Sequence, residues 1–257
     1  MKAIVLAAGY ATRLRPLTDS IPKQLLPVGG RPMLDWIVDK LEEVDEIDAV
    51  HLVTNARFAP DFELWAAARG EGVTVHDDGT TSNEDRLGAI GDIRLTIERA
   101  GLAGDDLLVI AGDNLFDFSL DDYVAWWHRK GRASAVALYD CGSRELASQY
   151  GVVDVEADDR IVGFVEKPSD PQSTLVATAT YIYHREQLPL VERYLAEGNP
   201  PDQPGNLIAW LHSREPVYGY RFSGAWFDIG DRDQLLEADN RLRARLGLPT
   251  RAEYALD

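Results

Sequence analysis

Hydrophobic residues in the first half of the chain form short continuous runs that alternate with stretches of helical spacing. The continuous runs, which are typical of buried strands, are residues 2–8, 49–54, 73–76, 106–111 and 133–139. The amphipathic stretches, which predict helices, are residues 34–41, 59–69, 87–100 and 120–129. Because strands and helices alternate, we expect a parallel sheet with helices on both faces.

The pattern changes after residue 140, where strand-like segments follow one another with turn residues between them. The predicted strands are residues 151–155, 160–165, 176–183, 217–222 and 225–229, and the predicted helices are residues 186–197, 207–211 and 232–246. Such strands would extend the first sheet or form a small flap beside it. We therefore expect an α/β fold with a mixed, mainly parallel central sheet, in a single domain over residues 1–257.

The charge balance limits the partners of the protein. Its 26 basic and 43 acidic side chains give a net charge of −17, which repels nucleic acid and anionic lipid, and also a nucleotide unless positive side chains gather locally. The single cysteine, Cys141, excludes an internal disulfide, and no apolar run approaches the ~18 residues of a membrane span. Because the N-terminal run lacks a signal-peptide pattern, we expect a cytoplasmic protein. The negative charge and the lack of a membrane span lead us to expect neither nucleic-acid nor membrane partners. Whether the protein forms a homo-oligomer stays open.

A loop of small residues follows the first predicted strand. Residues 6–18 read Leu-Ala-Ala-Gly-Tyr-Ala-Thr-Arg-Leu-Arg-Pro-Leu-Thr, and residues 22–28 read Pro-Lys-Gln-Leu-Leu-Pro-Val. Small side chains let backbone N–H groups approach a phosphate, and Arg13 and Lys23 add the positive charge that a triphosphate needs. The alternative is a surface turn with solvated charges. The glycine pattern of dinucleotide-binding loops is absent, which argues against an NAD-dependent oxidoreductase.

Two aspartates stand where predicted strands end. Asp113 follows a buried run in Gly-Asp-Asn, and Asp228 lies in Trp-Phe-Asp-Ile-Gly at residues 226–230. The carboxyl ends of strands form the edge where open α/β sheets bind ligands. Mg²⁺ prefers carboxylate, phosphate and water oxygens, so the two aspartates are candidate ligands. A turn residue at Asp113 and a helix N-cap at Asp228 are the alternatives.

A Glu-Lys pair, Glu166 and Lys167, precedes Pro168 in the second half of the chain. A sugar needs acceptors for its hydroxyl groups, its phosphate needs a cation, and this pair offers both. Neighbouring strand residues face opposite sides of a sheet, so both reach one ligand only if the chain bends, which Pro168 favours. Without that bend they form an ordinary solvated surface pair.

Together these segments resemble the motifs of the sugar-1-phosphate nucleotidyltransferases, the group that contains glucose-1-phosphate thymidylyltransferase. The family pattern Gly-x-Gly-Thr-Arg-Leu followed by Pro-Lys matches residues 9–14 and 22–23, with Ala11 in place of the second glycine. If that position requires a positive φ, Ala11 is strained there. The resemblance implies a Rossmann-like three-layer α/β/α nucleotidyltransferase fold, in which residues 1–140 bind the nucleotide and residues 141–257 bind the sugar phosphate.

The resemblance also implies a role for each motif residue. Arg13, Lys23 and Asp113 would be catalytic, and Asp113 and Asp228 would hold Mg²⁺ against the α-phosphate. The residues implied to bind the nucleotide are Leu6, Ala7, Ala8, Gly9, Thr12, Gly79, Asn83 and Gly112. Those implied to bind the sugar phosphate are Tyr150, Gly151, Glu166, Lys167 and Thr178. The implied reaction joins a nucleoside triphosphate to a sugar-1-phosphate and releases pyrophosphate.

The sequence decides neither the base nor the sugar. Thymidylyltransferases carry Pro-x-Gly-Leu-Ala-Gln where this chain has the Thr-rich segment 76–90, which looks closer to cytidylyltransferase segments. A pyrimidine triphosphate and a hexose phosphate such as glucose-1-phosphate are favoured. Two alternatives stay open. One is a phosphocholine-type acceptor, which Tyr150 and Trp226 allow; the other is a non-catalytic nucleotide-sugar sensor.

Overall fold

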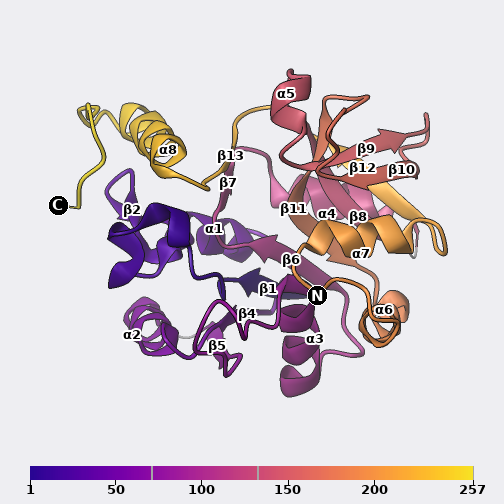
Figure 1. Ribbon diagram of the computed structural model, residues 1–257. Coiled ribbons are helices and arrows are strands. Elements are labelled where there is room, and N and C mark those ends of the chain that lie inside the picture. The colour runs from indigo at the N-terminus through magenta and orange to yellow at the C-terminus, as the bar shows by residue number, and fades with distance from the viewer. Residues whose placement is uncertain (71, 132, 257) are drawn as a thin grey trace.

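The computed structural model describes residues 1–70, 72–131 and 133–256 and centres on a nine-stranded sheet (Figure 1). The strand order is β10-β9-β11-β6-β1-β4-β5, and β8 pairs with both β11 and β12. The strands are β1 (Lys2–Leu6), β4 (Ala49–Thr54), β5 (Val73–Asp77), β6 (Leu107–Ala111), β8 (Ser134–Asp140), β9 (Gly151–Val155), β10 (Ile161–Glu166), β11 (Leu175–Tyr183) and β12 (Val217–Arg221). Within the described ranges, no helix has the length and apolar character needed to cross a membrane.

Strand direction makes the sheet mixed but mainly parallel, as predicted. β1 is parallel to both of its neighbours, with Leu6 opposite Val53 of β4 and Ala111 of β6. β11 is antiparallel to β6, β8 and β9, and β10 is antiparallel to β9. Because β5 and β12 are parallel to their partners, seven of the nine described strands run the same way. The carboxyl ends of β1 and β6 therefore meet at one edge of the sheet.

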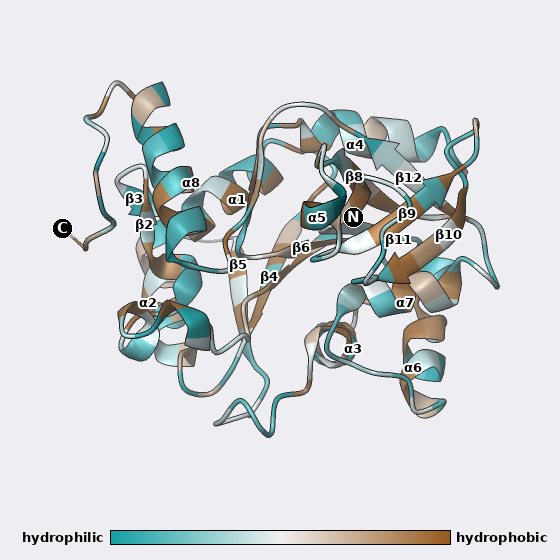
Figure 2. Ribbon diagram, turned by 45° about the horizontal axis from the view of Figure 1, so that its top comes forward, coloured by the Kyte–Doolittle hydropathy of each residue, from teal (hydrophilic) through white to brown (hydrophobic). Residues whose placement is uncertain are grey.

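Alternate residues of the central strands face two separate apolar layers. Ala3 and Val5 of β1 pack with α1, α2, α4 and α8, whereas Ile4 packs with α3, α6 and α7. The helices are α1 (Met33–Glu42), α2 (Ala59–Arg69), α3 (Ala89–Ala100), α4 (Leu120–His128), α5 (Arg144–Ala147), α6 (Pro189–Ala196), α7 (Pro204–Leu211) and α8 (Arg232–Arg245). Figure 2 shows hydrophobic residues concentrated on the central strands, while the outlying α8 is largely hydrophilic. This alternation produces the three layers expected from the sequence.

Two short ladders lie outside the main sheet. β7 (Asn114–Phe116) pairs antiparallel with β13 (Trp226–Asp228), and β2 (Pro27–Val28) pairs antiparallel with β3 (Arg31–Pro32). Short 3-10 turns, at Thr12–Leu14, Leu17–Asp19 and Lys23–Leu25, shape the loop between β1 and β2, and a further one, at Arg185–Gln187, precedes α6. Since β7 follows β6 almost directly, its ladder with β13 brings a distant part of the chain to the carboxyl end of β6.

Several predicted boundaries were wrong, and most of the shortest elements were missed, although the strand predicted over residues 225–229 is present as β13. β1 ends at Leu6 rather than residue 8, and α3 begins at Ala89 rather than residue 87. The helix predicted over 207–211 begins at Pro204, whose fixed φ suits the first turn of a helix. Strands of two or three residues, such as β2 and β7, are too short for any hydrophobic period to show.

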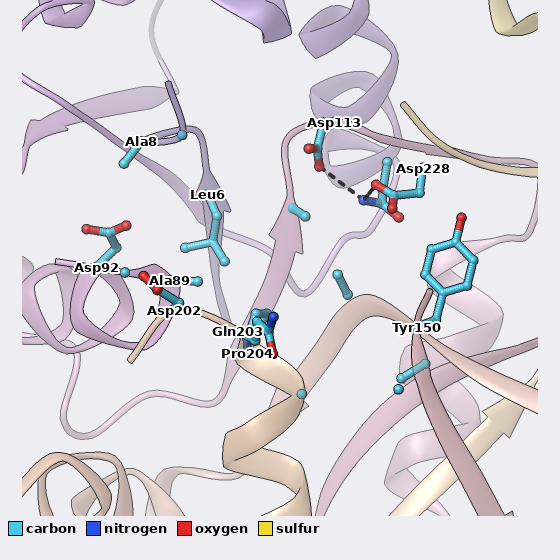
Figure 3. A pocket seen from close by; sticks show the side chains of 18 of the residues that line it. Leu6, Ala8, Ala89, Asp92, Asp113, Tyr150, Asp202, Gln203, Pro204 and Asp228 are labelled. Carbon is cyan, nitrogen blue, oxygen red and sulfur yellow. Dashed lines mark hydrogen bonds between the residues drawn. The ribbon is translucent and has the colours of Figure 1, made fainter. Parts of the chain in front are cut away.

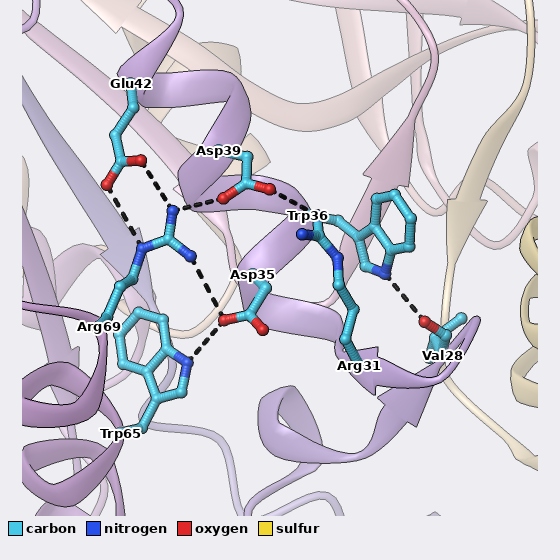
Figure 4. Close-up of polar contacts among 8 residues, drawn as sticks. All are labelled: Val28, Arg31, Asp35, Trp36, Asp39, Glu42, Trp65 and Arg69. Atoms are coloured by element: carbon cyan, nitrogen blue, oxygen red, sulfur yellow. Dashed lines mark hydrogen bonds and ion pairs between the residues drawn. The ribbon is translucent and has the colours of Figure 1, made fainter. Parts of the chain in front are cut away.

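An ion network joins α1 to α2 (Figure 4). The Arg69 guanidinium bonds the carboxyl groups of Asp39 and Glu42, with 2.8 Å between its Nη2 and Glu42 Oε2. Its Nη1 lies 3.5 Å from Asp35 Oδ1, which also accepts a hydrogen bond from Trp65 Nε1 at 2.8 Å. The Arg69 side chain is only 19% exposed, so water competes weakly for these contacts. A planar guanidinium is suited to bridging several carboxylates at once.

Replacing Arg69 by alanine should lower the free energy of unfolding by roughly 1–3 kcal/mol, because three carboxyl groups lose their shared cation. The measurement is a urea titration followed by circular dichroism. Arg193→Ala, which removes an exposed ion pair with Glu197, is the control and should cause no measurable change. Equal losses in the two variants would contradict a special role for the network.

Candidate active site

A cavity of about 510 Å³ opens at the carboxyl ends of β1 and β6 (Figure 3). One end is formed by the end of β1 and the loop after it, and by the first turn of α3 and the segment before it. The residues that line this end are Leu6, Ala8, Asn83, Ala89 and Asp92. The ladder of β7 and β13 lies at the centre, where Asp228 of β13 and Asp113, the residue before β7, line the cavity. The other end is lined by Tyr150, Gly151, Glu166 and Lys167, from the second half of the chain. This edge of the sheet is where α/β proteins bind ligands.

The ladder between β7 and β13 brings the two aspartates together. Asp228 lies opposite Asn114, the residue after Asp113. The Asn114 amide donates to Asp113 Oδ1 at 3.1 Å and to Asp228 Oδ1 at 3.4 Å, so one side chain touches both carboxyl groups. Its own oxygen accepts a hydrogen bond from Trp226 Nε1 at 2.7 Å, which fixes the orientation of the amide. The backbone adds a bond from Ile229 N to Asp113 O at 3.2 Å.

The two carboxyl groups differ in their charge environment. Burial disfavours ionisation of Asp113, but the Lys23 ammonium, 2.6 Å from its Oδ2, outweighs burial and holds the pKa of Asp113 below its usual range. Lys23 itself is 8% exposed, so this ion pair is well shielded from water. Burial and the charge of Asp113 raise the pKa of Asp228 to about 6. The centre of the cavity thus carries more negative than positive charge and would be stabilised by a further cation.

A magnesium ion fits the residues present at this centre. Two carboxylates are the hard oxygen ligands that Mg²⁺ prefers, and it commonly takes its remaining ligands from water and substrate phosphate. Within the described residues no group of three or more histidine, cysteine, aspartate or glutamate side chains could hold a metal. Asp113 and Asp228 together are therefore a partial site that a phosphate would complete.

The loop between β1 and β2, named the phosphate loop after its predicted role, is held by local contacts. Ala11 has φ 45° and ψ 44°, a left-handed conformation, where the family pattern has glycine. The Thr18 hydroxyl donates to the Ala11 carbonyl oxygen at 2.9 Å, and Leu14 is buried in the core. Arg13 reaches toward β13, because a Cβ added to Gly230 would lie 3.1 Å from its Nη2. The left-handed backbone that would strain an alanine is thus present at Ala11, stabilised by neighbouring contacts.

The far end of the cavity combines a carboxyl group with glycines. Cβ atoms added to Gly151 and Gly205 would come within 2.9 and 2.2 Å of Glu166 Oε2, so only glycine leaves room for this side chain. Burial raises the pKa of Glu166. Lys167 has φ 47°, which turns the chain after β10, and both side chains line the same cavity. This is the bend that the Glu-Lys pair required.

The structure brings most of the predicted site residues to the cavity. Those that line it are Leu6, Ala8, Gly9, Asn83, Asp113, Tyr150, Gly151, Glu166, Lys167 and Asp228. Lys23 lies beside it through its ion pair with Asp113. Ala7 is buried, and Thr12 and Gly79 are exposed outside it. Gly112 has a packing role, because an added Cβ would lie 3.0 Å from the Leu6 carbonyl oxygen.

Thr178 does not reach the cavity, contrary to the prediction. Its side chain is fully buried, and its hydroxyl donates to the Ala137 carbonyl oxygen at 3.0 Å. Ala177 and Ala179 line the cavity instead. The pairing of β11 with β8 shifts register between Ala177 and Tyr181, and such an irregularity redirects side chains in a way that sequence alternation does not reveal.

Two segments contribute more to the cavity than the sequence indicated. Arg86 forks onto Asp202, with its Nε and Nη2 at 3.0 and 2.8 Å from the two carboxylate oxygens. Asp202 belongs to a proline-rich stretch just after the helix predicted over residues 186–197, and no motif pointed to it. Asp92 lies in α3 between the buried Ile90 and Ile93, and an acidic residue among core positions was a signal that could have been used.

Residues 2–245 match the model of the nucleotidyl transferase family. The chain belongs to this family. It is 32% identical over 241 residues to UTP–glucose-1-phosphate uridylyltransferase of Synechocystis and 27% identical over 242 residues to the bifunctional protein GlmU of Methanocaldococcus jannaschii. These matches cover 90% and 94% of this chain but only 60% and 54% of the two relatives.

Solved structures share the nucleotidyl transferase fold. A putative glucose-1-phosphate thymidylyltransferase from Bacillus anthracis, in complex with sucrose, superposes with a TM-score of 0.81 at 26% identity and covers 95% of both chains. A UDP-glucose pyrophosphorylase complexed with UDP-glucose has a TM-score of 0.78 at 23% identity and covers 95% of this chain and 98% of that one. The fold expected from the motifs is thereby confirmed.

In this nucleotidyl transferase, Ala11→Gly should keep or increase stability, by up to about 1 kcal/mol, because glycine adopts the left-handed conformation without a Cβ clash. The free energy of unfolding in urea is the measurement. The matched control is Ala67→Gly at an exposed position inside α2, which should destabilise by about 1 kcal/mol. An equal loss in both variants would show that Ala11 is not strained.

Proposed function

We propose that this protein transfers a nucleotidyl group from a nucleoside triphosphate to a sugar-1-phosphate and releases pyrophosphate. The observation that carries the proposal is the meeting of Asp113 and Asp228 at the centre of the cavity, between the phosphate loop and the Glu166–Lys167 pair. These two regions could each bind a phosphate, and the carboxylates between them are suited to a metal ion. Such an arrangement suits a reaction between two phosphate groups. Membership of the nucleotidyl transferase family and the names of its relatives support the same reaction class.

The proposed reaction is one in-line displacement at the α-phosphorus. An oxygen of the sugar phosphate forms the new P–O bond while the bond to the bridging oxygen of pyrophosphate breaks. No general base is required, because a phosphate monoester is largely ionised at neutral pH, with a second pKa of about 6. The protein therefore contributes mainly by aligning the two phosphates and stabilising the charge that moves toward pyrophosphate.

Three cations divide these tasks. Arg13, which lies beside Gly230 at the ladder, would stabilise the leaving pyrophosphate. Lys23 keeps Asp113 ionised through their 2.6 Å ion pair and supports the same phosphates. Lys167 would hold the phosphate of the attacking sugar. Glu166 would accept hydrogen bonds from the sugar hydroxyl groups, in a buried setting that strengthens them.

Magnesium is the cofactor that we propose for Asp113 and Asp228. When bound there, it would neutralise charge on the α-phosphate. A pyrimidine triphosphate and a hexose phosphate such as glucose-1-phosphate are the proposed substrates, and the cytoplasm is the proposed location. These choices rest on the motifs and the relatives. The chain spans little more than half the length of the curated proteins it matches, so their substrates are proposals for this protein.

The reaction class can be tested by measuring pyrophosphate release, with Mg²⁺ present, across a grid of nucleoside triphosphates and acceptors. The acceptors should include several sugar-1-phosphates and phosphocholine. We expect release that requires both a triphosphate and one sugar-1-phosphate, and that stops when EDTA removes the metal. Pyrophosphate release that requires phosphocholine would show that the acceptor is not a sugar phosphate. Nucleotide binding without release would favour a sensor.

Asp113→Asn should reduce kcat by at least about a hundredfold, because it removes one of the two carboxylates at the centre of the cavity. Asp121→Asn, on the exposed first turn of α4, is the control and should keep full activity. Thermal unfolding and nucleotide binding should be measured for both proteins, so that a folding defect is recognised. A folded Asp113→Asn protein with normal kcat would remove Asp113 from the mechanism.

Lys167→Ala should raise KM for the sugar phosphate at least tenfold while KM for the triphosphate changes little, since Lys167 lies at the sugar end of the cavity. Lys130→Ala is the control, because Lys130 pairs with Asp159 far from the cavity. Steady-state kinetics with each substrate varied in turn give both constants. A rise confined to the KM of the triphosphate would show that Lys167 lies at the nucleotide end of the cavity instead.

A further inference from the structure

Two buried carboxyl groups stand at the nucleotide end of the cavity, outside the machinery described above. Asp78 follows β5 and Asp92 lies in the first turn of α3, and they are 7% and 5% exposed. Asp92 lines the cavity, and Figure 3 shows its carboxyl group directed from α3 toward Ala8. A buried acid without a cation is costly unless another group compensates it.

The two groups compensate each other by sharing a proton. A hydrogen bond between them contributes to the pKa shifts of both, and one oxygen of each, Asp78 Oδ2 and Asp92 Oδ1, is enclosed with no N–H or O–H donor among the described residues. The other Asp78 oxygen accepts a hydrogen bond from Thr80 N at 2.7 Å. Burial and the charge of Asp78 raise the pKa of Asp92 to about 8. At neutral pH the pair therefore holds one proton between two carboxyl groups.

Asp92 keeps one oxygen that the protein does not use. Asp78 is the one hydrogen-bonding partner of the Asp92 side chain in the described part of the chain. Since Oδ1 is enclosed and the residue lines the cavity, Oδ2 is left for a ligand. With the shared proton between the two carboxyl groups, this oxygen acts as an acceptor.

Hydrogen bonds fix the pair relative to the phosphate loop. The hydroxyl of Thr80, whose N–H bonds Asp78, lies 3.2 Å from the Tyr10 hydroxyl. On the neighbouring strand end, the Asn55 amide donates to the Ala8 carbonyl oxygen at 2.9 Å. The acceptor oxygen of Asp92 is thus held at a set position opposite the loop, as a group that reads a ligand must be.

The proposed function leaves this end of the cavity to the base. The α-phosphate lies at Asp113 and Asp228, the pyrophosphate extends toward Arg13, and the sugar phosphate lies at Lys167. The remaining end has the small apolar side chains of Ala8 and Ala89 on its walls, which suit the faces of a flat ring. Asp92 stands where an edge of that ring would arrive.

We propose that Asp92, held in place by Asp78, determines the base of the nucleotide and selects cytosine over uracil and thymine. This inference rests on the proposed function. The exocyclic amino group of cytosine donates a hydrogen bond to a carboxylate oxygen, whereas uracil and thymine present a carbonyl oxygen at the same ring position. Two facing acceptors repel and leave a buried polar group unpaired. This should lower kcat/KM for the wrong base relative to cytosine on the order of 10²-fold.

The test compares kcat/KM for CTP, UTP, dTTP and ATP at a fixed concentration of the accepted sugar phosphate. We expect CTP to exceed UTP and dTTP at least tenfold in the native protein. In Asp92→Ala this ratio should fall at least tenfold, because the variant removes the acceptor oxygen that the cytosine amino group would meet. Asp78→Asn should keep the preference, because its amide donates to Asp92 and leaves Asp92 an acceptor.

Glu98→Gln is the matched control, since it changes an exposed carboxyl group on the same helix and should leave the ratio unchanged. A purely structural role of the acid pair predicts equal losses with every nucleotide in both Asp variants, and that result would overturn the proposal. A native preference for UTP, dTTP or ATP would overturn it too, while leaving the nucleotidyl transfer in place. If no nucleotide releases pyrophosphate, calorimetric affinities of the native protein for CTP and UTP decide the inference separately.

Discussion

The pairing of β7 with β13 is the constraint on which the site depends. It places Asp228 beside Asn114, at a sequence separation of 114 residues, and so beside Asp113 at the end of β6. Two adjacent carboxyl groups repel each other, and the charge of Asp113, together with burial, raises the pKa of Asp228. Lys23 and the Asn114 amide offset it without removing it. The ladder thus holds an electrostatically unfavourable pair at a fixed position, which is what a cation site requires before its ion binds.

Placement of a few cations would resolve the conflict between an acidic protein and the anionic substrates proposed for it. With a net charge of −17, the surface as a whole would repel a triphosphate. Lys23 is buried next to Asp113, Arg13 reaches the β13 side, and Lys167 lines the far end. Because interactions are stronger away from water, the buried Lys23 counts for more than an exposed cation, while the exposed Arg13 and Lys167 add local positive charge. The same acidity discourages other polyanions from binding elsewhere.

The longer strands and helices were predictable from their continuous apolar runs and helical spacing, and so were the site residues at the ends of strands. Asp113 could be placed because β6 is a continuous apolar run that stops just before it. The neighbourhood of Asp228 and Asn114 could be expected only through the family resemblance, because a three-residue ladder leaves no pattern. Thr178 was misplaced by a register shift in β11, and Asp92 was overlooked because its partner Asp78 lies in a different element. Long-range pairing, and the irregularities it imposes, are set by packing that no local stretch encodes.

The two ends of the cavity are mechanically joined, and a glycine makes this junction feasible. Gly88 has φ +79°, and an added Cβ would lie 2.7 Å from the Pro201 backbone. Just after it, Ile90 N donates to Pro201 O at 2.9 Å, and the fork of Arg86 onto Asp202 closes the same junction from the cavity side. The segment before α3 therefore cannot move without the segment before α7. The first would contact the base and the second would border the sugar. Filling one end would therefore restrain the other through the backbone, and each bound substrate is expected to change the affinity for the other by the same factor, whichever enters first.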